Sequence, residues 1–184
     1  MQETELISEI QKGDKDAFKE FVDLYKKFII NICYKFVNNA DDANDIAQEV
    51  FIEVYRNINN FRGDSQVNTW LYRISVNKSL NFLRNNKKYS QTEEISNESW
   101  QIPNNEDSEF SPEISLINKE KKNILDKAIN SLPENQKTAF ILCKKEDLSY
   151  DDISKVLGIS LKAVESLIVR AKKNLQKLLI NYYK

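Results

Sequence analysis

The sequence predicts an all-α fold of two small helical domains joined by an acidic linker, the second domain containing a helix-turn-helix. The 184 residues include only three glycines and three prolines, and 30% of the residues are charged. Apolar residues recur with a period near 3.6 over long stretches, and no segment alternates in the manner of a strand. We therefore place the domains at residues 1–88 and 112–184, with the linker at residues 89–111.

Two helices are expected before residue 40. A short one ends near Gly13, and a second runs from about Asp14 to Val37. The apolar stripe of the second helix consists of Phe18, Phe21, Val22, Tyr25, Ile29, Ile32 and Cys33. This stripe is expected to form the first domain's core together with the helix that follows.

A third helix is expected at residues 42–59, with Asp41 as its N-cap. Gly63 interrupts the pattern before a fourth helix at about residues 66–86. The fourth helix carries apolar residues on more than one side, so we expect it to lie between the core and a ligand.

The second domain begins with a strong helix-start signal. Ser111 is a suitable N-cap, Pro112 suits the first helical position, and Glu113 places an acid in the first turn. The pair Leu132-Pro133 separates the first two of four helices, which are expected at residues 112–130, 134–146, 149–157 and 160–182.

The predicted third helix has two contrasting faces. Its inner stripe is apolar and consists of Ala43, Ile46, Ala47, Val50, Phe51, Val54 and Ile58. Ile52 lies at the centre of the opposite, polar face, which is formed by Asp45, Gln48, Glu49 and Arg56. An apolar residue centred on a polar outer face indicates a docking surface for another protein.

The segment from Phe61 to Asn77 mixes aromatic residues with arginines. Aromatic side chains stack on exposed bases, and arginines neutralise phosphates. A surface that binds single-stranded nucleic acid thus follows directly after a protein-binding surface. This order indicates a chain that brings a protein partner to nucleic acid.

Charge alternates along the chain in four blocks, although the net charge is −1. Residues 1–55 carry 12 acidic and 6 basic side chains, and residues 56–88 carry 1 acidic and 7 basic. Residues 89–118 carry 7 acidic and no basic side chains, and residues 119–184 carry 8 acidic and 14 basic. Two basic blocks separated by an acidic one predict two contacts with nucleic acid, although solvated charged faces would produce a similar pattern.

Other functional classes lack the residues that they require. No apolar run approaches the ~20 residues of a membrane span, and the N-terminus lacks the features of a secretion signal, so we expect a cytoplasmic protein without membrane insertion. The chain has no histidine, no glycine-rich phosphate loop and no cysteine pair spaced for zinc, so no enzyme, cofactor or metal site is expected. Cys33 and Cys143 are expected to be buried, reduced thiols.

Residues 148–173 have the pattern of a helix-turn-helix. Ser149 and Asp152 resemble a capping box, Gly158 suits a tight turn, and Ser160 is a suitable cap for the next helix. The buried contact is expected to join Ile153, Leu157 and Ile159 to Val164, Ile168, Ala171 and Leu175. The outer face of the second helix carries Lys162, Ser166, Val169, Arg170, Lys173 and Lys177. Basic and small polar residues on that face suit entry into the major groove of DNA.

Two blocks of the chain resemble the extracytoplasmic-function (ECF) sigma factors of bacterial RNA polymerase, in the order and at the spacing of that family. The segment DIAQEVFIEVYRNINNFRGDSQVNTWLYRISVN, from Asp45 to Asn77, resembles conserved region 2. The segment SLPENQKTAFIL and the helix-turn-helix after it resemble region 4. The resemblance extends over most of the chain.

The resemblance implies a dissociable specificity subunit that docks on core RNA polymerase, recognises the −35 and −10 promoter elements and melts the −10 region. The family's docking motif Asp-x-x-Gln-Glu is present as Asp45, Gln48 and Glu49. Together with Ile52 and Arg56, these residues are expected to contact the coiled coil of the β′ clamp. The β flap is a second expected contact on the polymerase, and an anti-sigma factor is a further partner that the resemblance allows.

The resemblance also implies two sets of DNA contacts. The −10 set consists of Phe61, Arg62, Gly63, Asp64, Ser65, Trp70, Arg73, Asn77, Lys78 and Arg84, in which residues 62–65 would shape a pocket for a flipped base. The −35 set consists of Ser160, Lys162, Ser166, Val169, Arg170 and Lys173. Glu165 and Leu167 stand where the family usually carries arginines, so no −35 sequence is predicted. The acidic linker would either thread into a polymerase channel or serve as a disordered tether.

The alternative interpretation is a stand-alone helix-turn-helix regulator with the first domain as a sensor. Such a regulator would bind its promoter tightly without polymerase. A sigma factor would bind weakly until the core enzyme is present.

Overall fold

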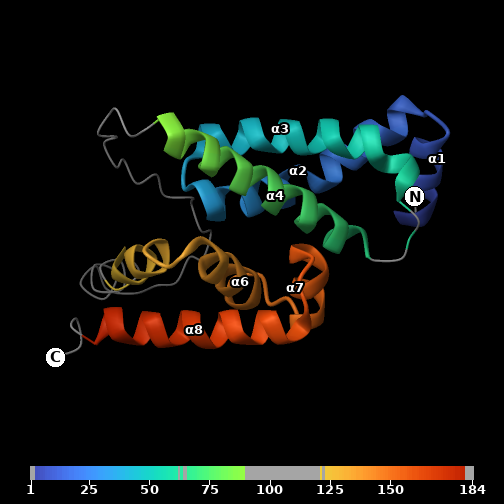
Figure 1. The fold of residues 1–184 in the computed structure, drawn as a ribbon. Helices are drawn as coiled ribbons and strands as arrows, with labels where there is room; N and C mark the ends of the chain where they lie inside the picture. The colour runs from blue at the N-terminus through green and yellow to red at the C-terminus, as the bar shows by residue number, and fades with distance from the viewer. Residues whose placement is uncertain (1–2, 62, 64–65, 90–120, 122, 181–184) are drawn as a thin grey trace, which may run out of the picture. The chain divides into compact units, whose positions relative to one another are not determined.

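The computed structural model describes residues 3–61, 63, 66–89, 121 and 123–180. All regular structure in these residues is helical (Figure 1), which confirms the predicted all-α class. The chain separates into two compact units, Met1–Gln101 and Ile102–Lys184. Apart from Tyr89, the expected linker at 89–111 lies outside the described residues, as does the start of the helix expected at 112–130.

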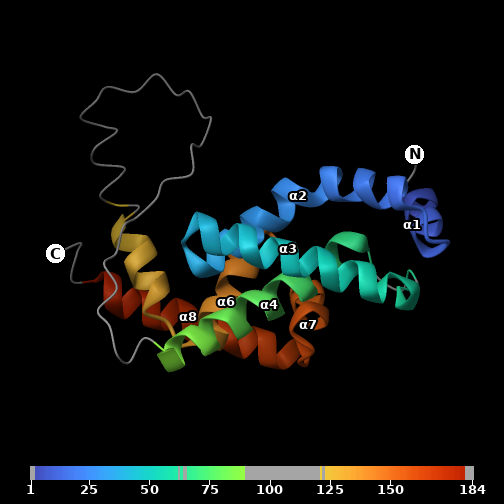
Figure 2. The same ribbon diagram turned by 90° about the horizontal axis from the view of Figure 1, so that it is seen from above.

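The described part of the first unit contains α1 (Glu3–Gln11), α2 (Lys15–Val37), α3 (Ala40–Asn57), the 3₁₀ turn η1 (Ile58–Asn60) and α4 (Val67–Tyr89). Helices α2, α3 and α4 each pack against the other two, and α1 packs against α2 and η1 (Figure 2). This arrangement places η1, which follows the end of α3, beside the N-terminal helix.

The start of α2 agrees with the sequence, whereas the start of α3 does not. Asp14 caps α2 as predicted, because its side chain accepts hydrogen bonds from the backbone N–H groups at the start of the helix. The prediction of Asp41 as the cap of α3 was wrong, since the cap is Asn39, whose side chain accepts from Asp41 N and Asp42 N at 2.9 and 3.1 Å. Asn38 ends α2 in the left-handed conformation, so α3 begins at once and its acids occupy the first turn, where the helix dipole favours them.

The core of the first unit lies between the facing stripes of α2 and α3, with α4 closing it. Ala43, Ile46, Ala47, Val50, Val54 and Ile58 are buried as predicted, while Phe51 is half-buried. On α2 the centre of the stripe is buried, but Phe18 and Val22 at its edge are half-buried. Ala17 and Phe36 extend the buried stripe at its two ends and were not predicted.

The first helix is fastened to α2 by a polar contact as well as by apolar packing. The Tyr25 hydroxyl donates a hydrogen bond to the Glu3 carboxylate. Burial, together with this hydrogen bond and the negative charge of Glu3, raises the pKa of Tyr25 above its usual value. The neutral hydroxyl is therefore the form that the folded unit favours.

The described part of the second unit contains helical residues 123–130, α6 (Glu134–Lys144), α7 (Tyr150–Leu157) and α8 (Leu161–Leu179). Ser149 and Ser160 cap α7 and α8 as predicted, and Gly158 ends α7 with a φ of 65°. The capping pair is one-sided, because the Asp152 carboxylate accepts from the Ser149 hydroxyl at 2.6 Å instead of from a backbone group.

The apolar contact between α7 and α8 is tighter at some positions than at others. Ile153, Val164, Ile168, Ala171 and Leu175 are buried. The predicted contact residues Leu157 and Ile159 are only half-buried, whereas Val156, which was not predicted, is buried.

The two cysteines have different surroundings. Cys33 is buried, and burial raises the pKa of its thiol to about 11, so it stays neutral and unreactive. The prediction that Cys143 is also buried was wrong, because α6 turns Ala139, Ile141 and Leu142 inward and leaves Cys143 half-buried at the edge of that face. Within the described ranges, none of the helices is both long and apolar enough to cross a membrane.

We expect the two units to unfold independently. Ile29→Ala opens a cavity in the first unit and Ile168→Ala opens one in the second, and each should lower the stability of its own unit by about 2–5 kcal/mol. Calorimetry of the full chain should show each variant shifting a different transition. A single transition that both variants shift equally would contradict independent unfolding.

Candidate nucleic-acid interface

The outer face of α3 is exposed over its whole length. Asp45, Gln48, Glu49 and Arg56 are all exposed, and Ile52 between them is 51% exposed. Tyr55, which the sequence analysis did not include, is 48% exposed on the same helix. Its spacing of three residues from Ile52 is a signal that could have identified it.

An open apolar hollow of about 440 Å³ lies beside Ile52. It is lined by Lys15, Phe18, Phe51, Ile52, Tyr55 and Arg56. The rings of Phe18 and Tyr55 meet edge to face at 4.9 Å, which joins α2 to α3 at the surface. The hollow has an apolar floor and two cationic side chains, so it suits a partner that offers an apolar residue next to acidic ones.

A second hollow, of about 370 Å³, lies between α3 and α4. Trp70, Arg73 and Asn77, all predicted as −10 contacts, line it from α4. Residues from the other side of the hollow were not predicted, namely Glu53, Asn57 and Asn60. Glu53 and Asn57 lie one turn apart on the side of α3 that faces α4, and Asn60 follows in η1. That side can be identified only once the packing partner of α3 is known.

The entry to α4 carries an aromatic pair. Phe61 and Trp70 are half-buried, and their ring centroids lie 5.0 Å apart. Arg84 is exposed further along α4, and Gly63, in the connecting segment, has a φ of 76°. Arg62, Asp64 and Ser65 lie outside the described residues.

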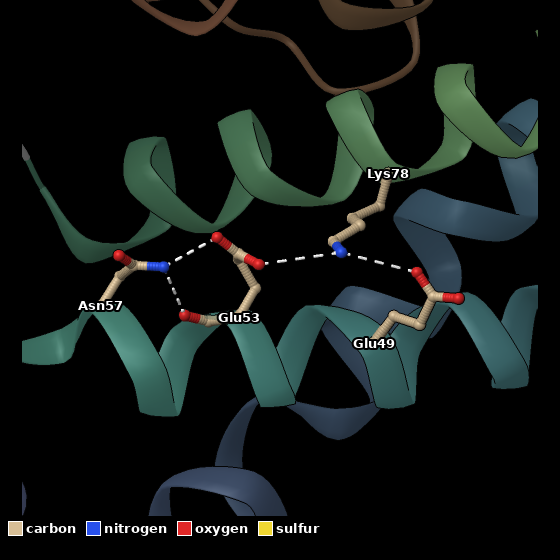
Figure 3. Close-up of polar contacts among 4 residues, drawn as sticks. All are labelled: Glu49, Glu53, Asn57 and Lys78. Atoms are coloured by element: carbon tan, nitrogen blue, oxygen red, sulfur yellow. Dashed lines mark hydrogen bonds and ion pairs between the residues drawn. The ribbon is translucent and has the colours of Figure 1, made fainter.

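Lys78 lies between two carboxylates of α3, as Figure 3 shows. Its ammonium is 3.5 Å from the Glu49 carboxylate and 3.7 Å from that of Glu53. The Asn57 side-chain amide donates to the Glu53 carboxylate at 2.7 Å and to the Glu53 backbone carbonyl at 3.1 Å. Lys78, a predicted DNA contact, is therefore already engaged within the protein.

The second unit presents the outer face of α8. Lys162, Ser166, Arg170 and Lys173 are exposed there, and Val169 at its centre is 64% exposed. The side chain of Ser160 caps the helix by accepting from Ala163 N at 3.3 Å. Glu165 shares the exposure of this face, whereas Leu167 is half-buried.

Two protein families match the chain, one in each unit. Sigma-70 region 2 matches residues 21–89, and sigma-70 region 4 matches residues 122–175. The first range contains α3, α4 and the hollow between them, and the second contains the helix-turn-helix.

Curated relatives match over nearly the full chain. The RNA polymerase sigma-H factor of Pseudomonas aeruginosa is 36% identical, with 97% of this chain and 94% of the relative covered. The ECF RNA polymerase sigma factor SigW of Bacillus subtilis is 34% identical, with 93% of each covered.

Solved structures share the fold at lower identity. CnrH in complex with the cytosolic domain of CnrY has a TM-score of 0.66 and 22% identity, covering 96% of each chain. The sigma factor RpoE of Bartonella quintana, in complex with the anti-sigma factor NepR, also has a TM-score of 0.66, with 23% identity over 90% of this chain and 98% of its own.

These matches decide between the two interpretations of the sequence. A stand-alone helix-turn-helix regulator does not account for a sigma region 2 beside a sigma region 4, so that alternative was wrong. The chain belongs to the extracytoplasmic-function sigma factors of bacterial RNA polymerase.

Proposed function

We propose that this sigma factor docks on core RNA polymerase through the outer face of α3, captures the −10 strand between α3 and α4, and holds the −35 element with α8. The observation that carries the proposal is the adjacency of the exposed face of α3 to a hollow lined by Trp70, Arg73 and Asn77. Membership of the sigma family supports core polymerase and promoter DNA as the partners. The protein acts as a non-catalytic, cytoplasmic subunit.

Docking draws on both the apolar and the charged parts of the α3 face. Ile52 and Tyr55 are about half exposed in the free protein, so a partner that covers them gains their burial. Asp45, Gln48 and Glu49 flank this apolar centre and fix the orientation of the partner by hydrogen bonds and charge. The coiled coil of the polymerase β′ clamp is the partner that fits, and the β flap is the second contact on the polymerase.

Capture of the −10 strand offsets the cost of separating the duplex. Each unstacked step costs a few kcal/mol, and stacking on an aromatic side chain returns about 1–3 kcal/mol per base. Trp70 lines the hollow and offers an aromatic surface for a base, and Asn77 offers an amide for a base edge. Arg73, which is exposed and also lines the hollow, offers a positive charge for a phosphate.

Recognition of the −35 element uses the outer face of α8. Lys162, Arg170 and Lys173 supply positive charge for phosphates, and Val169 and Ser166 face the bases. Glu165 reduces the favourable charge of this face by one. An anti-sigma factor is a further partner that we propose for the free protein, since the similar fold of RpoE was solved with one bound.

We expect Asp45→Ala and Ile52→Asp to abolish association with core polymerase while the fold is retained. Loss of an interface anchor typically costs ~2 kcal/mol or more of binding free energy. Leu24→Asp is the matched control, because Leu24 is a 61% exposed apolar residue on α2 that does not line the apolar hollow. If both α3 variants co-purify with core polymerase as well as the Leu24 variant does, the docking assignment is wrong.

Variants of the two proposed DNA contacts should differ in their activity on a promoter template that is already unpaired at the −10 element. Trp70→Ala and Arg73→Ala should retain core binding and closed complexes but lose promoter opening, because they remove groups that face unstacked bases. Lys162→Ala and Arg170→Ala should weaken recruitment and lower the salt dependence by about one phosphate contact each. On a template mispaired across the −10 element, the first pair should regain activity and the second pair should not.

Permanganate footprinting of unpaired thymines measures opening directly in these four variants. Normal bubbles in the double variant of Trp70 and Arg73 would show that melting depends on other residues.

Lys78→Gln tests whether this lysine leaves its carboxylates for DNA. If it contacts a phosphate in the open complex, the slope of log affinity against log salt should fall by about one contact. Lys12→Gln is the control, because Lys12 is also ion-paired, to Glu9 at 2.7 Å, but on α1. An unchanged slope in the Lys78 variant would mean that Lys78 serves only to join α3 to α4.

A further inference from the structure

The side chain of Gln11 connects the N-terminal helix to the entry of the −10 interface. Gln11 is the last residue of α1, and its amide nitrogen donates to the backbone carbonyl of Ile58 at 2.9 Å and of Phe61 at 3.1 Å. These carbonyls lie 47 and 50 residues further along the chain. Both hydrogens of the amide are therefore used on one short stretch of backbone.

The two carbonyls mark the beginning and the end of the turn that leaves α3. Ile58 begins η1, Phe61 is its C-cap residue, and Phe61 N donates to Ile58 O at 3.1 Å. The Ile58 carbonyl thus accepts from Phe61 N and from Gln11. The Phe61 carbonyl follows the last helical residue, where backbone carbonyls need donors from outside the helix. Gln11 supplies one donor to each end of the turn and so fixes the position at which Phe61 leaves it.

The position of Phe61 in turn affects Trp70. The two rings lie 5.0 Å apart and tilted by 43°, and Trp70 lines the hollow between α3 and α4. A displaced Phe61 would leave one side of the Trp70 ring without support. The contacts thus run without a break from Gln11 through Phe61 to the aromatic surface of the hollow.

The helix end that carries Gln11 is held in place by apolar packing and by the turn into α2. Leu6, Ile7 and Ile10 of α1 are buried, and Gly13 closes the turn into α2 with a φ of 92° and a hydrogen bond from its N–H to Ile10 O at 2.9 Å. A side chain on a frayed helix end could not hold a distant turn, whereas this one is fixed by packing on one side and by the turn on the other.

We propose that Gln11 is a positioning residue for capture of the −10 strand, because it sets the Phe61–Trp70 pair on which an unstacked base would stack. The inference rests on the proposed role of Trp70 in DNA capture. A carboxamide suits the task, since it offers two N–H donors in one plane. A carboxylate of the same shape would instead place oxygen acceptors against two carbonyl oxygens.

The first measurement concerns the free protein and does not depend on the proposed function. The chain has two tryptophans, so Trp100→Phe leaves Trp70 as its only one. In that full-length background, Gln11→Glu and Gln11→Met should shift the Trp70 emission to longer wavelength and increase its quenching by acrylamide. Lys12→Gln, which changes the exposed neighbour of Gln11 and its ion pair to Glu9 without removing the amide, is the control and should leave both properties unchanged.

The second measurement concerns DNA capture by the reconstituted holoenzyme. The probe is a labelled single-stranded oligonucleotide with the non-template −10 sequence of a promoter that the holoenzyme transcribes. Gln11→Glu should weaken probe binding about fivefold, the low end of what one base–aromatic stack contributes, with core affinity unchanged. Lys12→Gln should bind the probe as the parent does.

The outcomes separate the two proposals. Unchanged Trp70 fluorescence in both Gln11 variants would overturn the positioning role. Altered fluorescence with full probe affinity, in a protein where Trp70→Ala does lose affinity, would show that the position of the pair has no effect on capture and would also overturn it. Full probe affinity in Trp70→Ala itself would overturn the proposed role of Trp70, and with it the functional consequence of Gln11.

Discussion

The burial of the inner stripe of α3 is the constraint on which both proposed interfaces of the first unit depend. Val50 and Val54 are fully buried against the neighbouring helices. Because successive residues of a helix are about 100° apart, fixing this stripe also fixes which residues point outward and which point toward α4. Ile52 is thereby exposed at the surface, while Glu53 lines the hollow beside Trp70.

Periodicity predicted the fold and the faces of the helices well, because both follow from residue spacing alone. It was less successful where several residues compete for one local role. Asn38, Asn39, Asp41 and Asp42 can all cap a helix, and the left-handed backbone at Asn38 decided among them. The pattern of α4 was indistinct for another reason, since Ser75 and Ser79 are polar but fully buried on its inner side.

The residues of the candidate site that the sequence did not predict are those whose role depends on tertiary contacts. Gln11 and Phe61 are 50 residues apart, and no spacing rule joins them. Asn57 and Glu53 are one helical turn apart on α3, yet their relevance depends on Lys78 and Trp70, which come from α4. The sequence identified the residues of each helix that could bind a ligand. It could not identify the residues that hold them, because support of this kind depends on which elements meet.

The Lys78 ion pairs mean that the proposed docking surface and the proposed DNA-capture surface are not electrostatically independent. Glu49 belongs to the outer face of α3 and also lies 3.5 Å from the ammonium of Lys78, which projects from α4. A partner that binds the Glu49 carboxylate leaves Glu53 as the carboxylate paired with Lys78. These charges lie well within the screening length of physiological salt, about 8 Å, so a change at one affects the other. The effects of substituting Glu49 and Lys78 should therefore not be additive, since the two residues share one interaction.

Asp45 and Ile52 are not coupled to α4 in this way, because no ion pair to α4 involves them among the described residues. The effects of substituting them should report on the proposed docking alone, whereas the effect of substituting Glu49 also changes the charge beside α4.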